Sequence, residues 1–325
     1  MAKLKKLDNN LLSVDLGYSG CKAYCKINDK ELLIKIPSVV QKLDKNNIDD
    51  DDEVIEYNNN FYLVGDEAIN YNTHLKLDIK ALIENAPLFL YKIIKDNNID
   101  PKDLKIITGL SLKDYDYSEV FYDKLSNFEI DGQKYSFDIS LLPQGRGVAY
   151  DFYADKEIPE LAVILDIGYH TFDALVMRKG KVKKSESIAN DYGINKIFKF
   201  IEQKLEKDEI RRTTSELNEI VINHKGKMFV NGDEVDIMPL FNEAITSYIE
   251  NIYERFLSND TFLNILSRCK DIIFGGGGAY IIKKMELSKI KEIFKRENIS
   301  FSQEPYEFSN ARGYYIKAKL SNNEA

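Results

Sequence analysis

Two stretches of one pattern decide the fold: VDLGYSGCK at residues 14–22 and LDIGYHTFD at residues 165–173. Each places an Asp-x-Gly turn between an apolar strand and a returning strand. One such turn followed by Lys is typical of an ordinary hairpin. Two copies at strand ends are hard to explain by turn chemistry alone. Together they suggest two loops that grip one polyphosphate from opposite sides.

The sequence around each stretch extends the repeat into a meander of three strands. These strands are predicted at 11–15, 22–27 and 31–36, and again at 161–166, 172–178 and 181–187. Helical spacing of apolar residues predicts helices at 78–95, 147–155, 194–205, 244–257 and 281–287. Because strands and helices mix in both halves, we predict an α/β protein with two related domains.

The composition excludes several classes of protein. The chain has 325 residues, enough for two cores, and 45 Lys and Arg against 53 Asp and Glu give a net charge of −8. This balance argues against a general nucleic-acid binder, although a local basic patch stays open. The apolar runs are far shorter than the roughly 20 residues of a membrane-spanning helix, so we expect neither secretion nor membrane insertion.

Cysteine and histidine are few and scattered. No C-x-x-C spacing is present, so neither a disulfide framework nor a structural zinc site is indicated, and a reducing cytoplasm is expected. The histidines are too far apart in sequence to suggest a transition-metal site, so a metal here would be held by oxygen. The acidic run at residues 46–53 is interpreted as a solvated loop, since a calcium loop needs spaced ligands and a Gly. The residues concerned are Cys21, Cys25, Cys269, His74, His170 and His224.

The first loop combines a glycine-containing tip with two charged side chains. Backbone N–H groups of Gly17, Ser19 and Gly20 can approach an anion closely, and Lys22 can neutralise phosphate charge. The Asp15 carboxylate suits Mg²⁺, directly or through its waters. The stretch is not a P-loop, because its required Gly-Lys-Ser/Thr ending and helix are missing.

The second loop has the same carboxylate and glycine but different neighbours. Asp166 and Gly168 repeat the first loop, whereas His170, Thr171 and Asp173 differ from it. His170 could be a general base, but a lone histidine at a strand turn is more often structural.

Two further segments carry candidate chemistry. The run FGGGGAY at 274–280 follows a strand and precedes a helix, so its backbone could approach a base, ribose or phosphate; the alternative is a flexible turn. It does not fit the dinucleotide fingerprint, because Tyr280 occupies the last required glycine position. Gln144, in LLPQGRGVAYDF, follows Pro143 at a strand-to-helix junction and could orient a water towards a terminal phosphate. In isolation it would be an ordinary surface residue.

Taken in order, these motifs resemble the superfamily of actin, sugar kinases and heat-shock chaperone ATPases. Within it the sequence is most similar to the bacterial actin-like proteins of the ParM and Alp type, which are plasmid-segregation actins. The ending FSNARGYYI at 308–316 supports this, because those proteins finish with an Asn-Ala-Arg-Gly-Tyr/Phe segment that returns to the first domain. The resemblance covers essentially the whole chain.

The resemblance implies an actin-like fold, in which two related α/β domains have a nucleotide cleft between them. Residues 1–160 would form the first domain, with 31–75 as a small subdomain insertion and 309–325 returning to it. Residues 161–308 would form the second domain, with about 207–270 as its smaller subdomain.

The resemblance also implies roles for the motif residues. Gln144 would position the hydrolytic water, and Asp15 and Asp166 would be catalytic and hold Mg²⁺ mainly through water. Glu216 is a candidate contact to the base. The departures from the family are Tyr169 and His170, which replace smaller residues, and Gln144, where some relatives carry Glu. The cofactor-binding residues would be Gly17, Ser19, Gly20, Lys22, Gly168, His170, Thr171, Gly193, Gly276, Gly277, Gly278 and Tyr280.

The function implied is a cytoplasmic ATPase that forms dynamic filaments. ATP, with GTP as the alternative, would favour head-to-tail self-association, and hydrolysis would weaken the contacts. DNA would be reached through a DNA-binding adaptor, without direct nucleic-acid or membrane contact, which agrees with the net charge of −8. The rival hypotheses are a small-molecule kinase of the same superfamily and a non-polymerising chaperone-like or scaffold ATPase.

Overall fold

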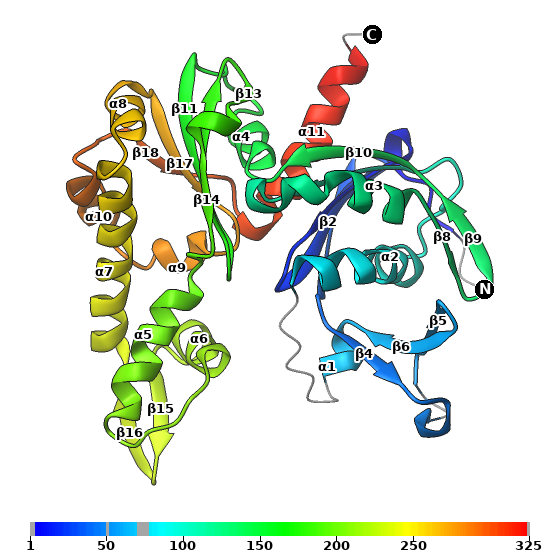
Figure 1. Ribbon diagram of the computed structural model, residues 1–325, viewed down its shortest axis with the longest axis horizontal. Coiled ribbons are helices and arrows are strands. Elements are labelled where there is room, and N and C mark those ends of the chain that lie inside the picture. The colour runs from blue at the N-terminus through cyan, green and yellow to red at the C-terminus, as the bar shows by residue number, and fades with distance from the viewer. Residues whose placement is uncertain (1–3, 50–51, 70–77, 324–325) are drawn as a thin grey trace. The chain divides into compact units, whose positions relative to one another are not determined.

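The structure is a computed structural model that describes residues 4–49, 52–69 and 78–323. The chain divides into two compact units (Figure 1). Unit 1 is Met1–Ile158 with Ser302–Ala325, and unit 2 is Pro159–Phe301. The chain therefore returns to unit 1 at Ser302, earlier than the residue 309 expected from the sequence.

The main sheet of unit 1 is built around the first of the two predicted meanders. Its strand order is β10-β7-β1-β2-β3, with β1, β7 and β10 parallel and β1, β2 and β3 antiparallel. β1 is buried along its whole length, as expected of a continuous apolar run in the middle of a sheet. The predicted meander is confirmed. The strands are β1 Leu11–Leu16, β2 Gly20–Ile27, β3 Lys30–Pro37, β7 Lys105–Leu110 and β10 Asp138–Pro143.

A second sheet of unit 1 corrects the expected extent of the small subdomain. The sequence predicts this subdomain at residues 31–75, but β3 pairs with β2 in the main sheet. The second sheet has the order β4-β6-β5-β8-β9 and recruits β8 and β9 from farther along the chain. The part of the expected subdomain at 70–75 lies outside the described residues. The elements are β4 Val40–Leu43, β5 Ile55–Tyr57, β6 Asn60–Val64, α1 Asp66–Ile69, β8 Asn127–Ile130 and β9 Gln133–Ser136.

Four α-helices longer than α1 lie in the described part of unit 1. The predicted helix at 78–95 is confirmed as α2, and Asp78 caps its start by accepting the Ala81 N–H. α11, drawn in red in Figure 1, packs on α4 and β1, and glycines allow the close contact, since a Cβ on Gly313 would lie 1.8 Å from the Gly147 carbonyl oxygen. The helices are α2 Ile79–Asp96, α3 Ser118–Ser126, α4 Arg146–Phe152 and α11 Ser309–Asn323.

The sheet of unit 2 repeats the meander with one difference from the prediction. β11 pairs antiparallel with β12 and parallel with β17, which in turn pairs with β18. The single return strand predicted at 181–187 is wrong: it is split into β13 and β14 around a 3₁₀ turn at Lys184–Glu186. Ser187 accounts for the break, because its hydroxyl accepts the Val176 N–H at 3.0 Å. The strands are β11 Leu161–Ile167, β12 Phe172–Arg178, β13 Lys181–Val182, β14 Ile188–Asn190, β17 Asp271–Gly275 and β18 Ile299–Phe301.

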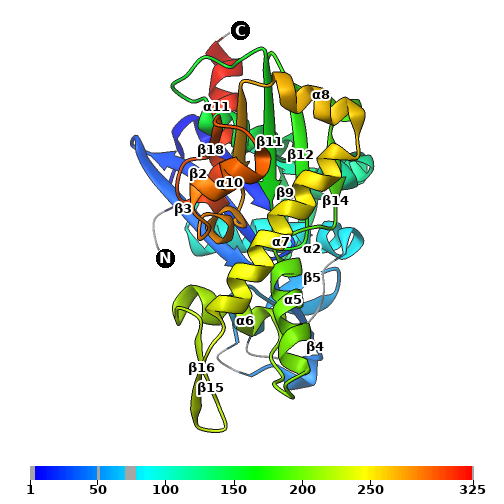
Figure 2. The same ribbon diagram turned by 90° about the vertical axis from the view of Figure 1, so that its left-hand side faces the viewer.

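The helices of unit 2 enclose an apolar core. The aromatic stripe of α7 is buried, including Phe241, Tyr248 and Phe256, so it serves packing. Figure 2 shows α7 running beside α5, with the hairpin of β15 and β16 below them. The helix predicted at 281–287 is interrupted between α9 and α10. The elements are α5 Asn195–Glu206, α6 Thr214–Asn223, β15 Lys227–Val230, β16 Asp233–Asp236, α7 Met238–Leu257, α8 Asp260–Arg268, α9 Ala279–Ile282 and α10 Leu287–Phe294.

Within the part of the chain that the structure describes, no helix combines the length and the apolar character needed to cross a bilayer. The remaining short 3₁₀ turns are Asp8–Asn10, Lys45–Asn47, Leu112–Tyr117 and Tyr306–Phe308.

Candidate functional site

The loop between β1 and β2, called loop 1 here, comprises residues 15–22. Its register places Asp15 opposite Lys22, and Lys22 Nζ donates to the Gly20 carbonyl oxygen at 2.9 Å. The Gly17 carbonyl accepts from the Ser38 hydroxyl at 2.5 Å, which fixes the turn. Ser19 is exposed at the tip. The structure therefore brings together the carboxylate, the glycines and the cation that the sequence singled out.

Asp15 lies in a buried polar environment. Only 9% of the residue is exposed, and Gln144 Nε2 donates to its Oδ1 at 2.7 Å. Burial raises the pKa of the Asp15 carboxyl, and Lys22 together with hydrogen bonds from Gln144 and Asn310 lowers it in part. The sheet order explains the meeting of Gln144 and Asp15, because β10, β7 and β1 run parallel and their carboxyl ends share one edge.

The loop between β11 and β12, called loop 2, comprises residues 166–173. Asp166 and Asp173 are register partners, and both are buried, at 8% and 2% exposed. The turn closes where the Gly168 N–H donates to the Thr171 carbonyl oxygen at 2.9 Å. Thr171 also limits the space at Gly168, where a Cβ would lie 2.9 Å from the threonine hydroxyl oxygen. His170 Nδ1 lies 3.2 Å from Asn195 Nδ2, so the ring is held by α5.

Two backbone segments of unit 2 converge on loop 2. The N–H of Gly193 donates to the His170 carbonyl oxygen at 3.2 Å, and the N–H of Gly278 donates to the Ile167 carbonyl oxygen at 2.7 Å. A Cβ on Gly193 would lie 2.4 Å from the Tyr169 carbonyl oxygen, and one on Gly276 would lie 2.3 Å from Asp166 Oδ1. Gly276 also has a φ of +75°. The lack of a Cβ at Gly193 and Gly276 therefore allows their segments to pack closely against loop 2.

Part of the segment at residues 274–280 is exposed to solvent. Gly277 is exposed, and Tyr280 is 36% exposed. The four-glycine run is therefore a defined turn, and Gly277 and Tyr280 are its accessible members.

Some residues take roles that the sequence did not indicate. Glu216 forms a capping box with Thr213 at the start of α6: its carboxylate accepts the Thr213 N–H at 2.6 Å, and these hydrogen bonds lower its pKa. Asn310 and Asn195 were not selected from the sequence, although Asn310 lies within the quoted ending. The sequence motif contains Asp173 but assigns it no function. The strand register shows that Asp173 is the partner of Asp166.

The donor chemistry fits Mg²⁺. Each unit has a buried aspartate near the end of a strand, Asp15 in unit 1 and Asp166 in unit 2, and oxygen is the ligand that Mg²⁺ prefers. Among the described residues, no group of three His, Cys, Asp or Glu side chains forms a metal cluster.

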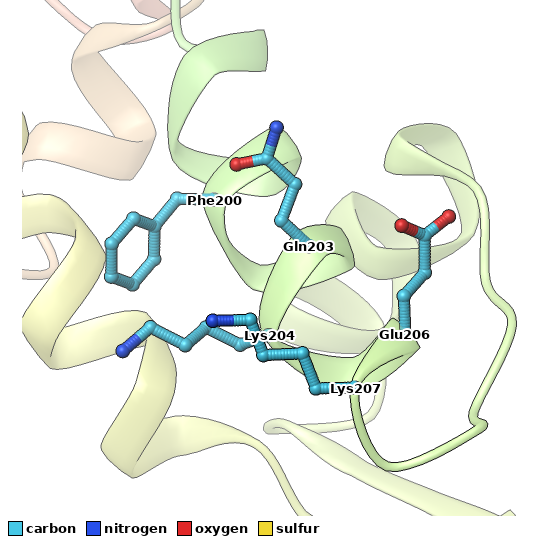
Figure 3. A pocket seen from close by; sticks show the side chains of 5 residues that line it. All are labelled: Phe200, Gln203, Lys204, Glu206 and Lys207. Atoms are coloured by element: carbon cyan, nitrogen blue, oxygen red, sulfur yellow. The ribbon is translucent and has the colours of Figure 1, made fainter.

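An open groove on α5 lies apart from these residues (Figure 3). Lys204 lies over the Phe200 ring, 5.1 Å from its centroid, and its Nζ is 3.4 Å from Glu243 Oε1 of α7. None of the predicted site residues lines this groove, whose lining is Phe200, Gln203, Lys204, Glu206 and Lys207.

Two family models match the chain in succession. Residues 13–147 match the N-terminal domain of actin-like proteins, and residues 164–288 match the C-terminal domain of archaeal MreB-like actin homologues. Together, the two matches show that the chain is similar to actin-like proteins. For this actin-like protein, the first match contains loop 1 and Gln144, and the second contains loop 2 and the glycine run.

Solved structures confirm the actin-like fold with two α/β domains. A non-polymerisable quadruple mutant of pCBH ParM is 21% identical, with a TM-score of 0.70 over 97% of this chain and 100% of that one. ParM in a 15-stranded filament from Clostridium botulinum is 20% identical, with a TM-score of 0.68 over 98% and 100%. An archaeal actin homologue is 17% identical, with a TM-score of 0.75 over 95% and 99%. No curated protein matches the chain in sequence.

Proposed function

We propose that this actin-like protein is a Mg²⁺-dependent nucleoside triphosphatase whose nucleotide state controls its assembly into filaments. One observation carries the proposal: buried Asp15 accepts a hydrogen bond from Gln144 and faces Lys22, at the carboxyl edge of the sheet of unit 1. A carboxylate, a neutral amide and a cation are the groups that hydrolysis of a terminal phosphate requires. Loop 2 repeats the carboxylate and turn, so we propose that both loops contact one nucleotide.

Gln144 is suited to orient the attacking water. Its Nε2 is engaged by Asp15 at 2.7 Å, which defines the rotation of the amide and makes Oε1 the acceptor for a water proton. A neutral amide is a weak base, so its contribution is positioning.

Lys22 and the loop backbones are suited to bind phosphate. Lys22 is half-buried and uses one donor on Gly20, so further N–H donors of its ammonium remain for phosphate oxygens. The exposed tip at Ser19 offers backbone N–H groups, and Gly168, His170 and Thr171 would play the same part in loop 2. Mg²⁺ held by Asp15 and Asp166, mainly through water, would neutralise phosphate charge.

The base and ribose would be bound by unit 2. Gly193, Gly276 and Gly278 shape the backbone around loop 2, and Gly277 and Tyr280 are accessible beside them. The related archaeal actin homologue has been solved in complex with ADP, which supports an adenine nucleotide. Glu216 is not proposed as a base contact, because its carboxylate caps α6.

The similarity to ParM supports proposals for self-association and for cargo. The C. botulinum relative forms a 15-stranded filament, and we propose that this protein also assembles head to tail. We further propose a cytoplasmic role in plasmid segregation through a DNA-binding adaptor, because the net charge of −8 disfavours direct binding to DNA.

The test combines phosphate release with sedimentation and light scattering. The wild-type protein and Gln144→Ala are compared with ATP, GTP, ADP and a non-hydrolysable ATP analogue, each with Mg²⁺. We expect polymer with ATP and with the analogue, and loss of polymer as ATP is consumed. Gln144→Ala should bind nucleotide and polymerise but release phosphate slowly. Hydrolysis by a protein that stays monomeric would contradict the filament proposal and favour a non-polymerising ATPase.

A further inference from the structure

Asn310 uses both ends of its side-chain amide inside the candidate site. The residue lies in the first turn of α11 and is 4% exposed. Its Oδ1 accepts the N–H of Gly145 at 2.8 Å, across 165 positions of sequence. A hydrogen bond from its side chain is also among the causes that lower the pKa of the Asp15 carboxyl. Because a carboxylate only accepts, the NH₂ group of Asn310 is the donor in that bond.

These bonds close a ring with Gln144. Gln144 Nε2 donates to Asp15, and Gln144 is followed directly by Gly145, which donates to Asn310. The side-chain amide of Gln144 is therefore fixed through Asp15, and its backbone is fixed through Gly145. Asparagine suits this position because it donates and accepts over a short reach, whereas an ionised aspartate cannot donate.

The start of α11 is itself held firmly. Arg312 Nε and Nη2 donate to Asp151 Oδ1 and Oδ2 at 2.8 and 2.9 Å, a buried bidentate ion pair with α4. The backbones also touch, since a Cβ on Gly147 would lie 2.4 Å from the Asn310 carbonyl oxygen. Asn310 therefore has little freedom to move away from Gly145.

We propose that Asn310 is a positioning residue for hydrolysis, which sets the orientation of Gln144 from the C-terminal helix. The inference rests on the proposed function, because it concerns the reaction assigned to Gln144. Residue 310 lies outside both segments that match family models, so the contact is visible only in the folded chain. In this proposal, α11 supports the two residues of unit 1 that act in hydrolysis, Asp15 and Gln144.

The kinetic test uses Asn310→Ala and Asn310→Asp in the full-length protein. Asn310→Ala removes both bonds, and we expect kcat for phosphate release to fall about 100-fold while KM for ATP changes less than about threefold, as for a residue that acts in the transition state. Asn310→Asp keeps the acceptor for Gly145 but places a second carboxylate at Asp15, so its kcat should also fall. Ile107→Val, in the cluster that α11 packs against, is the control for loosened packing and should keep kcat near the wild-type value.

A second measurement does not depend on hydrolysis. Amide hydrogen exchange of residues 141–147, without nucleotide, should accelerate at least about tenfold at Gly145 in Asn310→Ala and stay protected in Asn310→Asp. Unchanged exchange in Asn310→Ala, or a wild-type kcat in that variant, would overturn the inference. An equal loss of kcat in Ile107→Val would also overturn it. If the wild-type protein releases no phosphate, the proposed function fails, and exchange at Gly145 still decides whether Asn310 holds Gln144.

Discussion

Loops 1 and 2 share a backbone design and differ in charge. Both place an Asp at the end of a buried strand, a Gly two residues later, and a register partner seven residues after the Asp. In loop 1 that partner is Lys22, and in loop 2 it is Asp173. In loop 1 the carboxylate therefore lies opposite a cation on the neighbouring strand, whereas in loop 2 two carboxylates lie opposite each other.

The charge difference suggests a division of labour. Facing like charges in a sheet cost stability, and a cation or a proton relieves that cost. Loop 1 carries its own cation, and in our proposal Lys22 binds phosphate. Loop 2 is the more acidic loop, and in our proposal it depends on Mg²⁺ to meet the same phosphates.

The loops also differ in how they are supported. Loop 2 is held by backbone contacts with glycines of its own unit, at Gly193 and at Gly276 to Gly278. Loop 1 is held by side chains, namely Gln144 from β10–α4 and Asn310 from α11. A larger side chain at one of these glycines should therefore disrupt the structure of loop 2. Removal of the Gln144 or Asn310 amide should disrupt loop 1.

The largest effect is expected for the carboxylates that the loops share. Asp166→Ala should abolish hydrolysis, with phosphate release reduced about 1,000-fold or more, because the Mg²⁺ and phosphate charges lose their organising group. Asp15→Ala should act equally. Phosphate release in single-turnover assays measures this. Near-normal turnover in Asp166→Ala would show that loop 2 is misassigned.

A second prediction separates the loops by their tolerance of bulk. Gly193→Ala should destabilise the protein by about 3 kcal/mol, because its Cβ would lie 2.4 Å from a backbone oxygen. Gly17→Ala meets the Gly20 oxygen at 3.0 Å and should cost less than about 1 kcal/mol. Urea unfolding gives both values. Equal losses of unfolding free energy in the two variants would contradict the proposal that loop 2 is packed more tightly than loop 1.

A third prediction uses the register partners: replacing Lys22 should weaken nucleotide binding, and replacing Asp173 should not. Lys22→Met keeps length but loses charge, so nucleotide should bind about 30-fold more weakly, near 2 kcal/mol. Asp173→Asn removes a negative charge and should not weaken binding. Titration with a fluorescent ATP analogue at two salt concentrations measures both. Similar weakening in the two variants would contradict the division of charge.

The smallest effect concerns the stability cost of Asp15. Its pKa is raised in the folded protein above 3.8, mainly by burial, so the wild type loses stability as pH rises from 3.8 through the folded pKa. Asp15→Asn lacks this loss and should be the more stable protein at pH 7, with the advantage vanishing below pH 3.8. Thermal unfolding across pH measures it, with Asp138→Asn, an exposed carboxylate of β10, as control. A pH-independent difference would contradict the assigned cause.

Sequence alone predicted the parts of the fold that depend on local patterns. The strands around Asp15 and Asp166 and the helix α2 follow from apolar periodicity and turn residues. The turn at Asp131-Gly132 predicts the hairpin of β8 and β9, but the sequence does not predict that it joins the small sheet, because β5 pairs with β8 more than seventy positions away. To predict the hydrogen bond between Gln144 and Asp15, one must know the order of three parallel strands. To predict the hydrogen bond from Gly145 to Asn310, one must know where the last helix packs. No local pattern encodes such contacts.

We propose that loop 1 and loop 2 bind the same nucleotide. Isothermal titration with the non-hydrolysable ATP analogue and Mg²⁺ tests it most directly, on the wild type, Asp15→Ala and Asp166→Ala. We predict one nucleotide per chain, with affinity reduced at least about tenfold by either substitution. A stoichiometry of two, or an affinity that one of the substitutions leaves unchanged, would contradict this proposal.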